Sequence, residues 1–476
     1  MYLGLDLGTS GLKALLIDDD QAVLGEAHAS LEATRPKSGW SEQDPADWVV
    51  GCEAVMDALV AEHDLSGLRA IGLSGHMHGA TLLDASDNVL RPCILWNDTR
   101  SHVEAAEMDA DSAWRKITGN IVFPGFTAPK VSWVKNNEPD VFSQLSKVLL
   151  PKDYLRFWLT GETVSEMSDA AGTSWLDVGA RKWSKDLLEK TGLPPNAMPR
   201  LVEGSEASGT VRAALARRWG FGRVGVAGGG GDNAASAVGV GAVRPGTGFV
   251  SLGTSGVLFA PTPNFAPDAA TAVHTFCHAI PETWHQMGVI LSATDTLEWL
   301  VRLTGQSASA LTSGLGRLTP PGEAMILPYL GGERTPHNDA SVRGTMTGIS
   351  HMTDAEAATK AVLEGVVFAF RDGFDALAAT GTKIDTLLAV GGGSRSDYWL
   401  SAIASALNTS IQRPVSGDFG GAFGAARLAM MSDGGDVNIA TLPQVEKTFE
   451  PDPDLVDAFA EAQVQYRNTY SALKAV

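Results

Sequence analysis

LGTSG occurs at residues 7–11 and again, unchanged, at residues 252–256. Each copy lies between two short apolar runs, so each is expected to form the turn of a β-hairpin. The copies stand about half a chain length apart, which predicts two related domains, residues 1–242 and residues 243–476. The chain length of 476 residues also favours two domains, because a single core rarely holds so many.

Each glycine-bracketed turn offers backbone N–H groups and hydroxyls to an anion such as a phosphate. The residues concerned are Gly8, Thr9 and Ser10 in the first copy and Gly253 and Thr254 in the second. Asp6, just before the first turn, is suited to a magnesium ion, since hard cations prefer carboxylate and water oxygens. The alternative is an ordinary hairpin whose hydroxyls satisfy the turn backbone. The repetition favours one phosphate loop in each domain, with a ligand-binding cleft between the domains.

A glycine-rich stretch, GGGGDNAAS at residues 228–236, precedes the second LGTSG copy. Residues 224–227 are expected to form a buried strand and residues 233–240 a helix of small residues, which places Asp232 where strand meets helix. Glycines at such a junction let a ligand approach the backbone, and a carboxylate there can meet a substrate. The alternative is that Asp232 caps the helix, which Asp does well. The stretch by itself does not separate the two interpretations.

A third stretch, TLLAVGGGSRSDYW at residues 386–399, predicts an apolar strand that runs into Gly391, Gly392 and Gly393. A helix is expected to start near Ser394 or Ser396. This geometry lets backbone lie against a nucleotide phosphate or ribose at a helix N-terminus. GGAFGAA at residues 420–426 would suit an adenine slot, but taken alone it is better explained as a tightly packed junction.

Charge and composition exclude several classes of protein. The chain has 36 basic and 55 acidic residues, a formal net charge of −19, and no long basic run, so nucleic acid and anionic membranes are not expected partners. No apolar run is long enough to span a bilayer, and Asp6 interrupts any N-terminal signal region. Three widely spaced cysteines are typical of reduced thiols in the cytoplasm.

Several motifs together resemble those of the FGGY carbohydrate kinases. Those similar to the phosphate, catalytic and adenosine motifs of that family are DLGTSG at residues 6–11, GGGGDNAAS at 228–236, SLGTSG at 251–256 and AVGGGSRSDYW at 389–399. Further stretches, among them GLSGHMHGATLLD at 72–84, ILWNDTR at 94–100, GFTAPKVSWV at 125–134 and LLPKDYLR at 149–156, extend the resemblance over nearly the whole chain. It implies an α/β fold with two related actin/hexokinase-like (ribonuclease H-like) domains that flank a deep central cleft.

The resemblance also implies a reaction, the magnesium-dependent transfer of the γ-phosphoryl group of ATP to D-xylulose. Asp232 matches the family's catalytic base, and Asp6 matches the aspartate that supports the metal. The loops around Gly8, Gly253 and Gly391 match nucleotide-binding positions, and these include Thr9, Ser10, Thr254, Gly392, Gly393 and Ser394.

A sugar needs several directional donors and acceptors, because each buried hydroxyl left unpaired costs about 1–3 kcal/mol. Met77 and His78 match family positions that hold the sugar by backbone and imidazole, and the Met77 side chain is expected to pack. The other polar candidates are His76, Asn97, Asp98, Arg100 and Asn233. For Asn97, Asp98 and Arg100, a network that braces the sugar loop from behind is an equal alternative to direct contact.

Two alternatives stay open. The first keeps the chemistry but changes the sugar to ribulose, gluconate, another ketose or glycerol. The second is a non-catalytic nucleotide switch with the same fold, against which Asp232 and the polar sugar site argue. The expected ligands are a small sugar and ATP. A homodimer is common among such kinases, but no motif encodes the oligomeric state.

Overall fold

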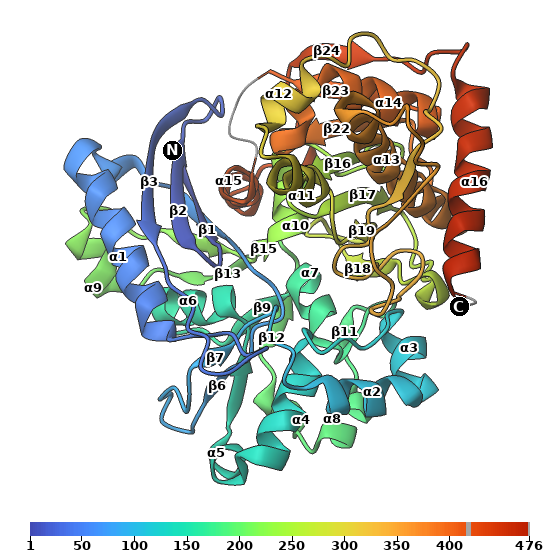
Figure 1. The fold of residues 1–476 in the computed structure, drawn as a ribbon. Coiled ribbons are helices and arrows are strands. Elements are labelled where there is room, and N and C mark those ends of the chain that lie inside the picture. The colour runs from blue at the N-terminus through green and yellow to red at the C-terminus, as the bar shows by residue number, and fades with distance from the viewer. Residues whose placement is uncertain (416–419, 475–476) are drawn as a thin grey trace. The chain divides into compact units, whose positions relative to one another are not determined.

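The computed structural model describes residues 1–415 and 420–474 and divides into two compact units (Figure 1). The first unit comprises Met1–Val243, Phe276–Trp284 and the described part of Asp418–Leu442. The second comprises the remaining described residues. Two segments of the range 243–476 therefore pack with the first unit, where the sequence analysis expected one continuous C-terminal domain. Within the described ranges, no helix combines the length and apolar character that crossing a membrane requires.

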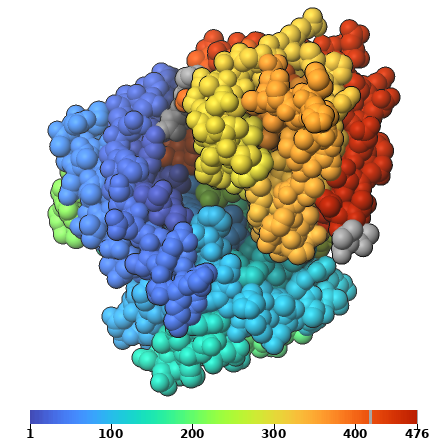
Figure 2. Space-filling view, in the orientation of Figure 1, coloured from blue at the N-terminus to red at the C-terminus, as the bar shows by residue number. Residues whose placement is uncertain are grey.

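The sheet of the first unit has the strand order β13-β14-β5-β1-β2-β3, and β15 pairs with β5. Its strands are β1 (Tyr2–Leu7), β2 (Gly11–Ile17), β3 (Val23–Ser30), β5 (Ala70–Gly75), β13 (Ala207–Thr210), β14 (Gly225–Ala227) and β15 (Gly230–Gly231). Strands β1, β2 and β3 are antiparallel, whereas β5 runs parallel to β1, β14 and β15. The predicted hairpin around the first LGTSG copy is confirmed. Strands β3 and β13 are the two edges of this sheet, and β3 belongs to the blue N-terminal part of the surface (Figure 2).

Helices cover both faces of this sheet because side chains alternate along its strands. On one face Leu12, Ala14 and Leu16 of β2 share a core with Trp48 of helix α1 (Pro45–Glu62). On the other face Leu15 and Ile17 pack with Ala422 and Ala426 of helix α15 (Gly421–Ser432). The sheet is thus the middle layer of three.

Helix α15 lies unusually close to its neighbours. A Cβ atom at Gly4 would stand 1.8 Å from the Ala422 carbonyl oxygen, and one at Gly72 would stand 1.8 Å from the Ala425 carbonyl oxygen. On its other side, a Cβ atom at Gly424 would lie 1.7 Å from the Ala235 carbonyl oxygen of α10 (Asp232–Gly239). The small residues of GGAFGAA therefore serve close packing within the first unit, which is the alternative that the sequence favoured for this stretch.

Two more helices, α6 (Pro151–Thr160) and α9 (Ala213–Arg218), contribute Leu155, Leu159 and Ala216 to the core that contains Trp48. The remaining part of the first unit has a core of its own around Trp114 and Trp175. Its helices are α2 (His102–Ala110), α3 (Ser112–Thr118), α4 (Thr127–Asn137), α5 (Pro139–Gln144), α7 (Met167–Ala170) and α8 (Lys185–Thr191). Its short strands are β4 (Glu42–Gln43), β6 (Thr81–Leu83), β7 (Cys93–Ile94), β8 (Lys147–Leu149), β9 (Val164–Glu166), β10 (Leu176–Asp177), β11 (Lys182–Trp183) and β12 (Arg200–Val202).

The second unit repeats the sheet plan of the first. Its sheet has the order β18-β19-β17-β16-β22-β23-β24. The strands are β16 (Phe249–Leu252), β17 (Gly256–Thr262), β18 (His274–Cys277), β19 (Trp284–Ile290), β22 (Thr386–Val390), β23 (Ser410–Pro414) and β24 (Val445–Phe449). As in the first unit, an antiparallel hairpin, here β16 and β17, is followed by parallel strands, β22 and β23. The predicted relation between the two halves is confirmed.

Helices and a separate hairpin complete the second unit. They are α11 (Thr294–Thr304), α12 (Ala308–Thr312), α13 (Ala355–Ala379), α14 (Asp397–Leu407), α16 (Val456–Lys474), β20 (Met325–Leu327) and β21 (Thr345–Thr347). Helix α13 is buried along most of its length, and α16, red in Figure 1, packs against it and α14. Helix α14 has Ser396 as its N-cap, as the sequence predicted.

Candidate functional site

The first sheet gathers the predicted residues of the first unit at one edge. Its register pairs Leu7 of β1 with Gly75 of β5, and Gly75 in turn with Gly231 of β15. The three parallel strands therefore end in one row, and the chain leaves each of them toward a predicted site segment. Carboxyl ends of parallel strands are where α/β sheets bind their ligands. The row brings the first LGTSG turn, Met77 with His78, and Asp232 to the same edge.

Two carboxylates stand at this edge. Asp6 lies on β1, where its Oδ1 accepts a hydrogen bond of 2.7 Å from Ser74 Oγ of β5. Burial, followed by the negative charge of Asp6, raises the pKa of Asp232 to about 6. The backbone N–H of Asn233, at 2.7 Å, and its side-chain Nδ2, at 2.9 Å, both donate to Asp232 Oδ1 and partly oppose that rise. Asp232 is therefore a carboxylate with the affinity for a proton that a general base needs near neutral pH.

In the structure, Asp232 is not the N-cap of helix α10. Gly231 is the N-cap of α10, and Asp232 is the first residue of the helix. The predicted strand, glycine and helix order is confirmed, with β14 ahead of the glycines and α10 behind them. The N-cap interpretation of Asp232 is wrong, since another residue holds that position.

The first LGTSG turn is held by side chains that sequence reasoning missed. Gln43 Nε2 donates to the Thr9 carbonyl at 2.7 Å, and Trp96 Nε1 donates to Thr9 Oγ1 at 3.0 Å. Inside the turn, the Gly8 N–H donates to the Gly11 carbonyl at 2.9 Å. Ser10 is exposed, and Trp96 keeps 48% of its surface exposed. Trp96 stands in the ILWNDTR motif quoted above, whereas Gln43 stands in none of the quoted motifs, and no spacing rule connects either residue to Thr9.

His78 is held in an uncommon conformation. Its φ is +70°, its ring stacks on Phe126 at 4.6 Å, and its Nδ1 lies 2.7 Å from the Gly172 carbonyl oxygen. Because a carbonyl oxygen only accepts, Nδ1 carries a proton in this contact. The Met77 side chain packs as predicted, since a Cβ atom at Gly231 would meet its Cγ at 2.9 Å.

The His78 backbone depends on a buried lysine. Lys130 Nζ donates to the His78 carbonyl at 2.9 Å and to the Gly125 carbonyl at 2.6 Å, and Thr127 Oγ1 also donates to the His78 carbonyl. Burial lowers the pKa of Lys130 to about 7. The sequence gave only one indication that this residue is special, since Lys130 is the single charged residue in the stretch 125–134.

Asp98 and Arg100 form the bracing network that the sequence left open. Arg100 Nε and Nη2 donate to Asp98 at 2.9 and 2.6 Å, and the Ser41 N–H donates to Asp98 at 2.6 Å. Arg100 also pairs with Glu42 at 2.7 Å and lies 3.6 Å above the Trp40 ring. Both side chains are almost fully buried, so they position the loop between β7 and α2 rather than face solvent.

Two other polar candidates lie near this loop. Asn97 is half-buried, and its Oδ1 has no hydrogen-bond partner within the described chain. His76 is buried edge-on against Trp48, and burial lowers its pKa to about 3, so it is neutral. A neutral buried histidine is suited to packing and hydrogen bonding, not to carrying charge.

The second unit brings its predicted residues together in the same way. The Gly253 and Thr254 carbonyls accept the N–H groups of Thr294 and Ala293 at 2.9 and 2.8 Å, where α11 begins. Gly391, with φ +86°, lies directly on the end of β16, since its Cβ would stand 2.8 Å from the Leu252 carbonyl. The second LGTSG turn and the start of the Gly391 loop are thus neighbours.

The Gly391 loop shows its three glycines in two different roles. A Cβ at Gly393 would meet the Leu252 side chain at 2.8 Å, whereas one at Gly392 would meet no described atom within 4 Å. Ser394 is buried, and its Oγ donates to the Gly391 carbonyl at 2.7 Å. Gly391 and Gly393 are therefore explained by packing, whereas no packing contact accounts for Gly392, whose open side leaves room for a ligand.

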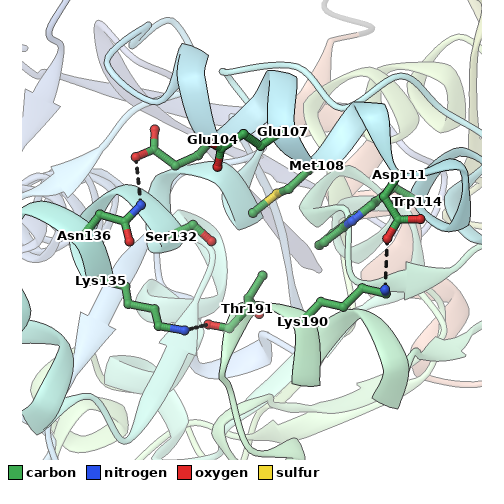
Figure 3. Close-up of a pocket in the computed structure, with 10 residues that line it drawn as sticks. All are labelled: Glu104, Glu107, Met108, Asp111, Trp114, Ser132, Lys135, Asn136, Lys190 and Thr191. Carbon is green, nitrogen blue, oxygen red and sulfur yellow. Dashed lines mark hydrogen bonds and ion pairs between the residues drawn. The ribbon is translucent and has the colours of Figure 1, made fainter.

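A pocket of about 290 Å³ lies elsewhere in the first unit, among α2, α3, α4 and α8 (Figure 3). Several of its polar groups bond to one another or to the backbone. Asn136 bonds to Glu104 at 3.2 Å, Lys190 pairs with Asp111 at 2.9 Å, and Lys135 bonds to the Thr191 carbonyl. None of the predicted site residues lines it, so it is not the candidate site.

Comparison with protein families gives two matches. The N-terminal domain model of the FGGY family of carbohydrate kinases matches residues 1–239. The C-terminal domain model of the same family matches residues 248–432. The two matches together cover most of the chain.

Individual relatives match over the full length. Xylulose kinase of Escherichia coli K12 is 45% identical over 479 aligned positions, covering 99% of both chains. The crystal structure of a xyloylose kinase from Brucella ovis superposes with a TM-score of 0.99 at 60% identity, covering 100% of this chain and 99% of that one. The xylulose kinase of Rhodospirillum rubrum superposes with a TM-score of 0.93 at 28% identity, with coverage of 100% and 99%.

Gly391 and Gly392 give a matched pair of variants for the loop of the second unit. Gly392→Ala points a methyl group into open space, so the melting temperature should stay unchanged while ATP binding weakens by about 1–3 kcal/mol, the usual cost of overpacking. Gly391→Ala should instead lower the melting temperature, because of its positive φ and the Leu252 backbone. Calorimetric ATP titration and thermal melts of both variants test this. Unchanged ATP affinity in Gly392→Ala would remove the loop from the nucleotide site.

Proposed function

Because the chain belongs to the FGGY family of carbohydrate kinases, we propose that it transfers the γ-phosphoryl group of ATP to D-xylulose and forms D-xylulose 5-phosphate. The observation that carries the proposal is Asp232, a carboxylate of raised pKa at the end of a glycine loop beside Asp6. The sugar follows from the full-length relatives named above.

Asp232 is assigned the role of general base. It orients the primary hydroxyl of the sugar and accepts its proton while the new oxygen–phosphorus bond forms and the bond between the β- and γ-phosphates breaks. An alcohol is far too weak an acid to ionise first, so orientation is the larger part of this contribution. Asn233 supports the role because both of its bonds fall on Oδ1, which fixes the rotation of the carboxylate.

The sugar is assigned to the segment after β5 and to Asn233. The Nδ1–H group of His78 donates to the Gly172 carbonyl, so Nε2 is the ring atom that we assign to a sugar hydroxyl, with the Met77 backbone beside it. Asp98 and Arg100 are assigned to bracing, since each already satisfies the other. Asn97, with an unpaired side-chain oxygen, is the member of that loop retained as a direct contact.

The nucleotide is assigned to the two LGTSG turns and the loop from Gly391 to Ser394. Among residues 1–415 and 420–474, no group of three or more side chains is arranged to hold a metal ion by itself. Asp6 therefore fits a magnesium ion that takes its other ligands from phosphates and water. When bound, the ion neutralises negative charge on the phosphates. Thr9 and Ser10 are assigned to the phosphates by their place in the first turn.

We also assign the enzyme to a reducing compartment, the cytoplasm. Cys52, Cys93 and Cys277 are free thiols and buried. Burial raises the pKa of Cys52 and of Cys277 to about 12, so neither is a reactive thiolate. These thiols are therefore structural residues, not redox groups.

The pH dependence of the reaction tests the role of Asp232. A base with a pKa of about 6 is protonated below that pH, so kcat/KM for the sugar should fall about tenfold for each pH unit below 6. The measurement is initial velocity from pH 5 to pH 8 at saturating magnesium and ATP. A rate that stays constant down to pH 5 would contradict the assignment, because a carboxylate of raised pKa would then not be needed in its ionised form.

A substrate panel tests the sugar. D-xylulose should give the highest kcat/KM among D-xylulose, D-ribulose, D-gluconate and glycerol, since the segment around His78 and the loop around Asn97 match relatives that act on it. ADP release in a coupled assay measures this. A tenfold preference for ribulose, gluconate or glycerol would contradict the assigned sugar but not the kinase activity. ADP release that does not depend on any sugar would contradict the kinase activity itself.

A further inference from the structure

A cluster of charged side chains lies fully buried behind the catalytic loop of the first unit. Lys152 Nζ contacts Asp153 at 2.8 Å, Asp169 at 2.9 Å and Glu166 at 3.3 Å. Arg156 contacts Asp153 at 2.6 Å. All five side chains have no exposed surface. Nothing in the proposed reaction uses these charges directly.

The cluster combines cations and carboxyl groups inside the protein. Lys152 and Arg156 supply its positive charges, and Asp153, Glu166 and Asp169 supply its carboxyl groups. Burial raises the pKa of Asp169, whereas the charge of Lys152 opposes that rise. Buried ion pairs add little net stability over an apolar core, so their presence calls for another explanation.

The cluster reaches both ends of the glycine loop. Arg156 Nη2 donates to the carbonyl of Gly228, the first of the four glycines. The N–H of Gly231, the last of them, donates at 3.0 Å to Ser168 Oγ. That hydroxyl in turn donates to Glu166 at 2.8 Å. The loop that carries Asp232 is therefore fastened at its start by Arg156 and at its end by Ser168.

The glycine loop, residues 228–231, has no side chains that could pack against its surroundings, so its position depends on contacts made to its backbone. Gly229, with φ +78°, has a conformation that glycine adopts readily but does not enforce. A displacement of about 1 Å at a reacting group can cost about 100-fold in rate.

We propose that Ser168 and Arg156 are positioning residues for Asp232, and that the buried cluster of Lys152, Asp153, Glu166 and Asp169 exists to hold them. The inference rests on the proposed role of Asp232. Neither residue contacts the substrate in this account, and each acts on the backbone of the loop.

The test compares two buried serines that undergo the same substitution. Ser168→Ala removes the acceptor of the Gly231 N–H, whereas Ser208→Ala removes a hydroxyl that donates to the Val226 and Ala227 carbonyls, upstream of the loop. Both residues have no exposed surface, so the variants should lose similar thermal stability. Ser168→Ala should lower kcat about 10- to 100-fold with little change in KM for ATP, and Ser208→Ala should leave kcat near that of the unmodified enzyme.

Two further readouts separate positioning from a general loss of structure. In Ser168→Ala the amide hydrogens of residues 228–236 should exchange faster than in the unmodified enzyme, whereas in Ser208→Ala their exchange should stay unchanged. Arg156→Lys keeps the charge near Asp153 but loses the fork that spans Asp153 and Gly228, so it should also lower kcat. Each of these results supports the proposal.

The opposite results are equally specific. If Ser168→Ala keeps the kcat and the amide exchange of the unmodified enzyme, or if Ser208→Ala lowers kcat as much, the positioning role is overturned and the proposed function stands. An unmodified protein that phosphorylates no sugar would overturn the function and this inference together.

Discussion

The register of the first sheet fixes where the proposed catalytic residues lie. Leu7, Gly75 and Gly231 form one row across three parallel strands, and the chain leaves each of them into a segment that carries candidate site residues. A slip of one residue in any of these pairings would turn the following side chains to the opposite face. The glycines at the row matter for the same reason, because a Cβ at Gly75 would press on Lys152 at 3.0 Å and one at Gly231 on Met77. Backbone pairing, not side-chain choice alone, places Asp232 beside Asp6.

The electrostatic environment of Asp232 then determines how well its carboxylate can accept a proton. Asp6 and burial both favour the protonated form of Asp232, and the bonds from Asn233 limit that effect, which leaves a pKa of about 6. A carboxylate of ordinary pKa would be a weaker proton acceptor, and one of much higher pKa would be protonated at neutral pH. Arg100 pairs with Asp98 and Glu42, and Lys152 with three carboxyl groups. Asp6 is the charged group that shifts the pKa of Asp232.

The sequence predicted the elements that depend on local patterns. Both LGTSG turns are hairpins, the GGGGD stretch joins a strand to a helix, and α14 starts after Ser396, because glycine, serine and apolar periodicity act over a few residues. It did not predict that helix α15 belongs to the first unit, since a repeat suggests continuous halves and says nothing of a segment that returns.

Which polar side chains are buried could not be predicted from the sequence either. Asp98 and Arg100 are typical sugar-binding residue types, and only their mutual distance and lack of exposure identify them as braces. The central claim is that Asp232 is the base, and Asp232→Asn tests it most directly. The account predicts that kcat falls by about 10² to 10⁴ or more, while the melting temperature and ATP affinity stay near those of the unmodified enzyme. An Asp232→Asn variant that is stable and still active would contradict it.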